Sequence, residues 1–250
     1  MRKTIGLLML AALVCSPVWA DVITFQNNVG DYDGETDSGI RQEGIYRNYG
    51  ASASLGSGWE SQELISFFRF DDMFGSAAYQ LPAGQTITGA KLKLYVESLD
   101  NSGTDRTMNA SAMTRPIDMG NKAGSNADEG QVCWYFRACD VEDWAGNTHA
   151  GPVAGSDYTT TDAASSVINA TGWAEWDVTA IVQAWYAGTL DNEGFVIRQS
   201  DTTNDRRTNF TATEGGGNAP LLEITYTPEP ATMSLLALGG LGVLLRRRSR

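Results

Sequence analysis

The stretch "GWAEWDVTAIVQAWYAGTLDNEGFVIRQS", residues 172–200, decides the fold because it holds a strand end, a short helix and a second strand in order. Its middle, residues 177–188, places three apolar side chains on one helical face: Ile181, Val182 and Trp185. Asp177 or Thr179 can cap the start of this helix, and Gly188 can end it. A dozen residues make only about three turns, so we expect the helix to close one end of a β core.

Strand signals recur on both sides of this stretch, with turn residues between them. Runs rich in β-branched and aromatic residues, each bounded by Gly, Asn, Asp or Pro, occur at 21–26, 63–71, 85–98, 194–200, 206–213 and 220–227. We expect residues 27–39 to be a loop because they lack apolar periodicity, and residues 100–170 to form long loops. Many short strands and one short helix predict an all-β fold, an antiparallel β-sandwich.

The N-terminus has the pattern of a secretory signal peptide. Arg2 and Lys3 precede an apolar run, residues 5–14, and Val18 and Ala20 stand at the −3 and −1 positions of a cut. The alternative, a short anchor, would need a span of about 20 apolar residues. We therefore predict that residues 1–20 are removed and that the rest of the chain is exported.

The C-terminus, residues 228–250, has three parts in order. Pro228-Glu229-Pro230 comes first, and an uncharged span from Ala231 to Leu245 follows. A basic cluster comes next: Arg246, Arg247 and Arg248. As a helix the span is about 22 Å long, short of a hydrocarbon core of about 30 Å, so it crosses only a thinned bilayer or with snorkelling flanks. We expect a transmembrane helix that anchors the chain temporarily, with its arginines in the cytoplasm.

The charge of the exported part excludes one class of partner. The two end segments, 1–20 and 231–250, hold six of the 18 basic residues and none of the 30 acidic ones. Residues 21–230 therefore carry 12 basic against 30 acidic side chains, a net charge of −18. Such a surface repels phosphate backbones, so we expect no nucleic-acid partner. It suits a soluble exported protein and is compatible with calcium binding.

Two cysteines remain after removal of the signal peptide, Cys133 and Cys139 in "CWYFRAC". In an exported chain, two cysteines this close favour one small disulfide loop. The alternative is a pair of buried thiols.

The stretch "DYDGETDSG", residues 31–39, is the strongest metal-site candidate. Three aspartates in it offer hard oxygen ligands: Asp31, Asp33 and Asp37. Gly34 and Gly39 let the chain bend tightly, as calcium sites often require. The spacing is not that of an EF-hand loop. Two interpretations stay open, a structural Ca²⁺ site and a solvated acidic turn.

The order of motifs along the chain resembles that of DNRLRE domains. The motifs are "DSGIRQEGIYRNYGASASLGSG" (37–58), "LISFFRFD" (64–71), "LPAGQTITGAKLKLYV" (81–96), the opening stretch (172–200) and "NDRRTNFTATEGGGNAPLLEITY" (204–226). The resemblance covers residues 22–227, although "NDRRTNFTATE" departs from the letters that name the family. It implies a jelly-roll-like β-sandwich domain over residues 21–227, related to carbohydrate-binding modules and without a known catalytic role.

The tail, residues 228–250, resembles a second family, the PEP-CTERM sorting signals, in its triplet, apolar span and arginine cluster. This resemblance implies processing by an exosortase in a Gram-negative bacterium that makes exopolysaccharide, and a mature protein on the cell surface or outside the cell.

Few residues offer catalytic chemistry. The chain has no Gly-x-Ser-x-Gly motif, and one histidine, His149, completes no familiar triad. Glu175 and Asp177 share a strand face about 7 Å apart, yet a cap role for Asp177 is the simpler interpretation. Aromatic rings can stack on sugars, and three tryptophans in irregular surroundings are the sugar-contact candidates: Trp59, Trp134 and Trp144.

Three hypotheses follow from these observations. The leading one is an exported, non-catalytic β-sandwich protein of the cell envelope or extracellular matrix that binds polysaccharide. The second is a structural or adhesion protein of the matrix that recognises no sugar. The third is a polysaccharide-active enzyme that uses loop carboxylates, which would need a cleft with two facing acids.

Overall fold

The computed structural model describes residues 19–200 and 206–228. The predicted signal peptide and sorting tail lie almost wholly outside these ranges. The described strands are β1 (Asp21–Phe25), β2 (Glu35–Arg41), β3 (Ser54–Trp59), β4 (Glu63–Phe70), β5 (Thr86–Leu99), β6 (Arg106–Ala112), β7 (Phe136–Ala138), β8 (Glu142–Asp143), β9 (Ala164–Ile168), β10 (Gly172–Asp177), β11 (Phe195–Gln199), β12 (Arg206–Thr211) and β13 (Leu221–Thr227). The described helices are α1 (Thr179–Tyr186) and two short 3₁₀ turns, η1 (Ala145–Asn147) and η2 (Thr213–Gly215).

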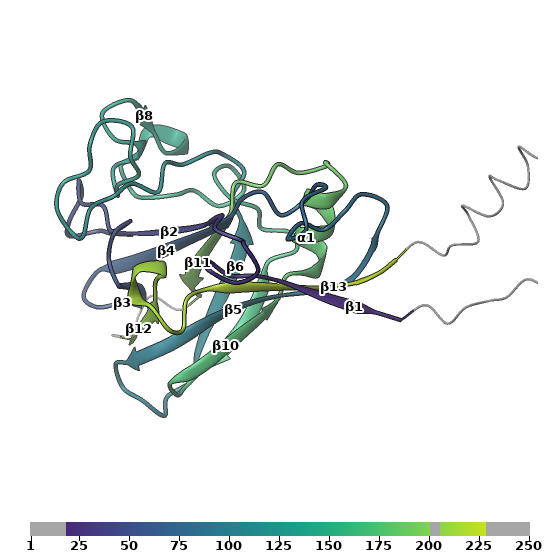
Figure 1. Ribbon diagram of the computed structural model, residues 1–250. Coiled ribbons are helices and arrows are strands. Elements are labelled where there is room, and N and C mark those ends of the chain that lie inside the picture. Colours follow the sequence, from purple (N-terminus) through teal and green to yellow (C-terminus); the bar gives the residue numbers. More distant parts are fainter. Residues whose placement is uncertain (1–18, 201–205, 229–250) are drawn as a thin grey trace, which may run out of the picture.

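Eleven of these strands form one curled antiparallel sheet (Figure 1). Its order is β1-β13-β5-β12-β3-β4-β11-β6-β9, with β10 also beside β5 and β2 also beside β4. The two halves meet where β3 pairs with β12 along its length but with β4 only at Gly58 and Trp59. Strands from both halves bury their inner faces in one core, for example Phe25, Phe68 and Leu94. The expected antiparallel β-sandwich is confirmed.

The helix α1 closes one end of this core, as its apolar spacing predicts. Ile181, Val182 and Trp185 are its buried residues. The N-cap position is Val178, without a side-chain cap, and not Asp177 or Thr179 as expected. Asp177 lies one residue earlier, where its Oδ1 accepts hydrogen bonds from the backbone N–H of Thr179 at 3.1 Å and from the Thr179 hydroxyl at 2.5 Å. No helix in the described ranges is long and apolar enough to cross a membrane.

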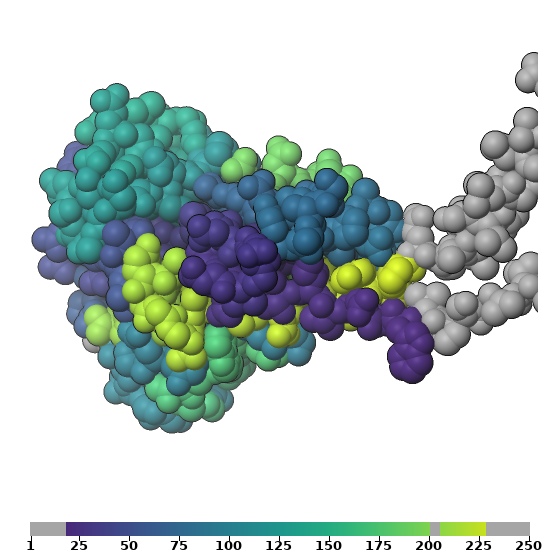
Figure 2. Space-filling view, in the orientation of Figure 1, coloured from purple at the N-terminus to yellow at the C-terminus, as the bar shows by residue number. Residues whose placement is uncertain are grey.

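Residues 113–163, which we call the cap, form a lobe over the outer face of β2, β4 and β11 (Figure 2, teal). A second apolar cluster joins the cap to that face, and in it Trp144 stacks on Phe67 with ring centroids 6.2 Å apart. The carboxylate of Asp157, fully buried, accepts hydrogen bonds from Arg115 and from the backbone N–H of Ala145 and Val153. The cap is therefore a packed structure with its own core.

Five strands correct the expected loops. β2 begins inside residues 27–39, and β6, β7, β8 and β9 lie inside residues 100–170. β6 and β9 contribute small or flexible apolar side chains to the core, such as Met108 and Ala164, which give a weak strand signal. β2 has no apolar alternation because its core-facing positions hold Glu35, Asp37 and Gly39, opposite Phe70, Phe68 and Ser66.

Candidate functional site

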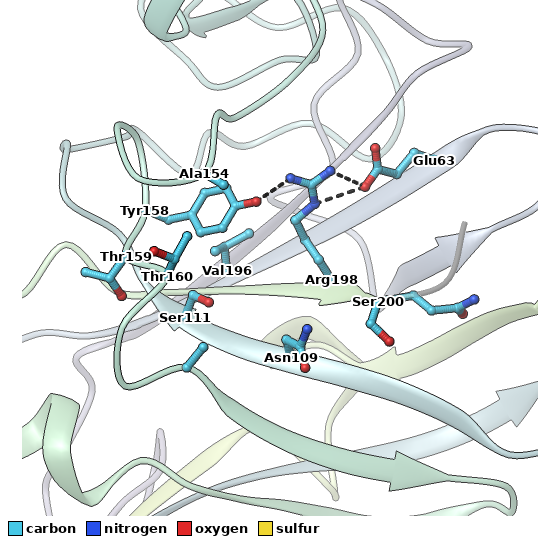
Figure 3. A pocket seen from close by; sticks show the side chains of 12 residues that line it. Glu63, Asn109, Ser111, Ala154, Tyr158, Thr159, Thr160, Val196, Arg198 and Ser200 are labelled. Carbon is cyan, nitrogen blue, oxygen red and sulfur yellow. Dashed lines mark hydrogen bonds and ion pairs between the residues drawn. The ribbon is translucent and has the colours of Figure 1, made fainter. Parts of the chain in front are cut away.

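A cleft of about 420 Å³ lies on the outer face of the sandwich, where the end of the cap borders β6 and β11 (Figure 3). Polar side chains dominate its lining: Glu63, Asn109, Ser111, Tyr158, Thr159, Thr160, Arg198, Gln199 and Ser200. Ala154, Ala163 and Val196 complete the wall. The cleft opens to solvent, and Tyr158 supplies the one aromatic ring among its described lining residues.

Side chains alternate between the two faces of β11 and β6, and this alternation puts the polar groups on the outer face. In β11, Phe195 and Ile197 enter the core, so Val196 and Arg198 point outward. In the neighbouring β6, Met108 and Ala110 are in the core, and Asn109 and Ser111 point outward beside Val196 and Arg198. The sandwich thus presents a rigid polar floor, and the cap supplies the wall that carries Tyr158.

Arg198 is fixed at the centre of the cleft. Its Nε donates to Glu63 Oε1 at 2.9 Å, Nη2 also donates to Oε1, and Nη1 donates to the Tyr158 hydroxyl at 2.6 Å and to the Pro152 carbonyl at 3.3 Å. Burial lowers the pKa of Arg198, but the contacts with Glu63 and Tyr158 outweigh it and raise that pKa. The guanidinium is therefore a permanently charged, positioned group whose charge Glu63 balances.

The rest of the floor consists of hydroxyl and amide groups. Ser165 of β9 donates to Asn109 Oδ1 at 2.7 Å, and the Ser200 hydroxyl donates to the Thr107 carbonyl at 3.3 Å. Glu63 is the one carboxylate among the described lining residues, and it is engaged by Arg198. This arrangement suits hydrogen bonding to a hydroxyl-rich ligand and does not provide the two facing acids that glycoside hydrolysis requires.

None of the three candidate tryptophans lines this cleft. Trp134 is 3 % exposed and Trp144 0 %, because both fill the apolar cluster under the cap, and we correct the expectation that they reach a sugar. Trp59 is partly exposed at the end of β3, where its backbone pairs with Glu63.

The tryptophan that sequence reasoning missed is Trp173. It is 44 % exposed on β10, with the Tyr95 ring edge-on at 5.4 Å. Trp173 and the buried Trp176 are an odd number of residues apart and so lie on opposite faces of the strand, which is the sequence signal that could have identified Trp173 as the exposed ring.

The cysteines correct a second expectation. Cys133 and Cys139 are free thiols, both buried, which corresponds to the alternative interpretation rather than the disulfide loop. Burial, with a contribution from Cys139, raises the pKa of the Cys133 thiol to about 12, so the thiolate is disfavoured.

The three aspartates of the predicted calcium site are not brought together. Asp31 and Asp33 are exposed in the loop before β2, whereas Asp37 is buried within β2. The described residues contain no group of three His, Cys, Asp or Glu side chains arranged to hold a metal. Calcium binding itself stays a prediction.

The carboxylates of β10 are engaged in structural contacts. Glu175 forms ion pairs with Lys91 at 2.8 Å and Lys93 at 3.3 Å, which lower its pKa. The hydrogen bonds from Thr179 lower the pKa of Asp177. Neither group has the raised pKa of a general acid.

Two comparisons with known families agree with this architecture. Carbohydrate-binding module family 96 matches residues 121–226, from the cap to β13. The PEP-CTERM protein-sorting motif matches residues 227–248 directly after it. No curated protein matches the chain. The DNRLRE name itself stays a prediction.

The sorting motif implies recognition by an exosortase, and export with passage to the membrane before cleavage. The chain therefore carries a region similar to a carbohydrate-binding module, followed by a PEP-CTERM sorting motif.

Proposed function

We propose that this exported protein binds a polysaccharide in the cleft between the cap and β6–β11, without turning it over. The observation that carries the proposal is the positioned group Glu63–Arg198–Tyr158 on a floor of hydroxyl and amide side chains. The match to a carbohydrate-binding module family, which includes the cap wall and β11, supports it.

The charge balance of the cleft favours an uncharged polymer. Glu63 neutralises Arg198, and no other lining residue within the described ranges is charged. The chain as a whole is acidic, so long-range electrostatics disfavour an acidic polymer. Amide and hydroxyl groups discriminate sugars through the hydrogen bonds that they form, and Tyr158 offers the apolar ring face that a sugar can cover.

The cellular setting belongs to the same proposal. We expect an exosortase to cleave near Pro228-Glu229-Pro230 and the apolar span to serve as a temporary anchor, and the match to the sorting motif over residues 227–248 supports this. The released protein then acts on the cell surface or in the extracellular matrix of a Gram-negative bacterium.

The proposal is tested with full-length protein purified in detergent and applied to a panel of neutral and acidic polysaccharides. We expect binding to at least one neutral polymer. Tyr158→Ala should weaken it about tenfold or more, because the variant removes the ring and one of the contacts that position Arg198. The matched control is Trp173→Ala, which removes an exposed aromatic ring outside the cleft and should leave affinity unchanged.

Two results would redirect the proposal. If Trp173→Ala abolishes binding while Tyr158→Ala does not, the sugar site lies on β10 and not in the cleft. If no polysaccharide binds at all, the second hypothesis, a matrix protein without sugar recognition, becomes the better one.

A further inference from the structure

Two acidic side chains of β2 lie on the core side of the sheet. Glu35 and Asp37 are each 3 % exposed, and their strand partners Phe70 and Phe68 belong to the main core. Neither carboxylate oxygen of Glu35 has a hydrogen-bond partner among the described residues, and the same holds for Asp37 Oδ1. The other oxygen, Asp37 Oδ2, accepts one hydrogen bond from the backbone N–H of Thr213 at 2.7 Å.

The surroundings of Glu35 and Asp37 disfavour their ionised forms, because the site is buried and another acid lies nearby. Burial raises the pKa of Glu35 well above its ordinary value, and the charges of Asp37 and Glu214 raise it further. Burial likewise raises the pKa of Asp37 to about 7, in spite of the hydrogen bond from Thr213. A buried carboxylate is stable only when it is protonated, paired with a cation or bound to a metal.

The pair is held in place from two sides. Asn27 fixes the backbone of Glu35, since its Oδ1 accepts from the Glu35 N–H at 2.9 Å and its Nδ2 donates to the Glu35 carbonyl at 2.8 Å. On the other side η2 approaches β2 through Thr213, and Glu214 follows in the same turn. Figure 2 shows these early residues (purple) beside the segment that follows β12 (yellow-green).

We propose that Glu35 and Asp37 bind a divalent cation between β2 and η2, and that this ion is Ca²⁺. The donors are carboxylate oxygens, the hard ligands that suit Ca²⁺ and Mg²⁺ rather than zinc or copper. Mg²⁺ keeps several waters in a strict octahedron, which a buried pair disfavours, whereas Ca²⁺ accepts mixed carboxylate, carbonyl and water ligands in flexible geometry. Glu214, exposed at the rim, is the third carboxylate within electrostatic reach.

The ion has a structural role that is independent of sugar binding. β2 comes early in the chain and η2 comes near the end of the fold, so one ion links two distant segments. It also satisfies three carboxylate oxygens that have no partner among the described residues. The site differs from the aspartate set read from the sequence, because Glu35 replaces Asp31 and Asp33.

The test is thermal unfolding of the full-length chain in detergent at pH 8, in chelator and in Ca²⁺ up to about 10 mM, well above the dissociation constants of about 0.1–1 mM found in extracellular calcium modules. We expect Ca²⁺ to raise the Tm by several degrees. Glu35→Gln and Asp37→Asn, which keep the shape but remove a charge, should each lose most of this rise. Their Tm in chelator should equal or exceed that of wild type, because the repulsion is relieved. Terbium luminescence, sensitised by nearby aromatic rings such as Tyr32, gives a second readout that does not depend on unfolding.

The matched control is Asp33→Asn, an exposed acid of the neighbouring loop, which should keep the full response to Ca²⁺. An unchanged Tm of wild type in Ca²⁺, together with no terbium signal, would overturn the proposal and show that the two acids are held protonated. Loss of the response in Asp33→Asn but not in Glu35→Gln would also overturn it, in favour of a loop site.

Discussion

Trp144 shows how a single side chain attaches the cap to the sandwich. It is fully buried, stacks on Phe67 of β4 at an interplanar angle of 16°, and its indole Nε1 donates to the Cys133 carbonyl at 3.1 Å. We expect Trp144→Ala to lower the free energy of unfolding by roughly 3–5 kcal/mol, because it leaves a large cavity under the cap. Urea unfolding measures this loss, and Trp173→Ala, at an exposed ring, should cost less than about 1 kcal/mol.

The two thiols offer another test at this scale. Cys133 and Cys139 are buried, and the raised pKa of Cys133 keeps it protonated at neutral pH. We expect a thiol reagent to leave the folded protein unmodified over minutes and to label two cysteines of the described fold once it is unfolded. If no cysteine of the described fold is labelled in denaturant, Cys133 and Cys139 form a disulfide and their assignment as free thiols is wrong.

Among the elements, the cap depends on one buried carboxylate. Asp157 accepts hydrogen bonds from Arg115 and from two backbone N–H groups that lie far apart along the cap. Asp157→Ala leaves all three donors without this partner, so we expect a loss of roughly 3–5 kcal/mol and faster proteolysis between residues 113 and 163. If the fold loses stability but the cap stays resistant to protease, Asp157 does not hold the cap.

The contacts of Asp177 at the start of α1 should make the stability of the fold depend on pH. The hydrogen bonds from Thr179 hold the pKa of Asp177 below its unfolded value of 3.8. The stability that they add is therefore complete above that value and is lost as the pH falls through the lower, folded pKa. We expect Asp177→Ala to cost about 1 kcal/mol at pH 7 and the difference from wild type to shrink as the pH falls below 3.8. If the difference in free energy of unfolding between Asp177→Ala and wild type stays the same at acidic pH, the destabilisation comes from lost packing and not from the charge of Asp177.

How far the sequence predicts these elements depends on what their inner faces carry. β5 and α1 bury large apolar side chains at regular spacing, so their periodicity predicts both elements. β2 carries acids and a glycine on its inner face, and its pattern therefore resembles a loop. The cleft could not be predicted, because its residues come from β4, β6, β11 and the cap, and only the fold brings them together.

At the scale of the whole molecule, the sorting motif implies that the chain passes through the membrane before cleavage, and a change in the motif tests this. Replacement of Glu229 by Ala alters the triplet of the matched sorting motif and leaves the described fold untouched. We expect this variant to stay in the membrane fraction, whereas wild type is released, as cell fractionation and immunoblotting would show. Release of the variant at the wild-type rate would contradict a role for the triplet in cleavage.

The position of β13 determines how the fold bears a mechanical load. β1 and β13 run side by side, with Asp21 opposite Tyr226, so both ends of the fold meet at one pole, away from the cap (Figure 1). β13 is not an edge strand, because β1 and β5 flank it. On the proposal that the cleft holds a polymer while the tail anchors the chain, a load that enters through the C-terminal end of β13 is directed along that strand. Ladder bonds lie across that axis, so they resist the pull together in shear and do not open one at a time.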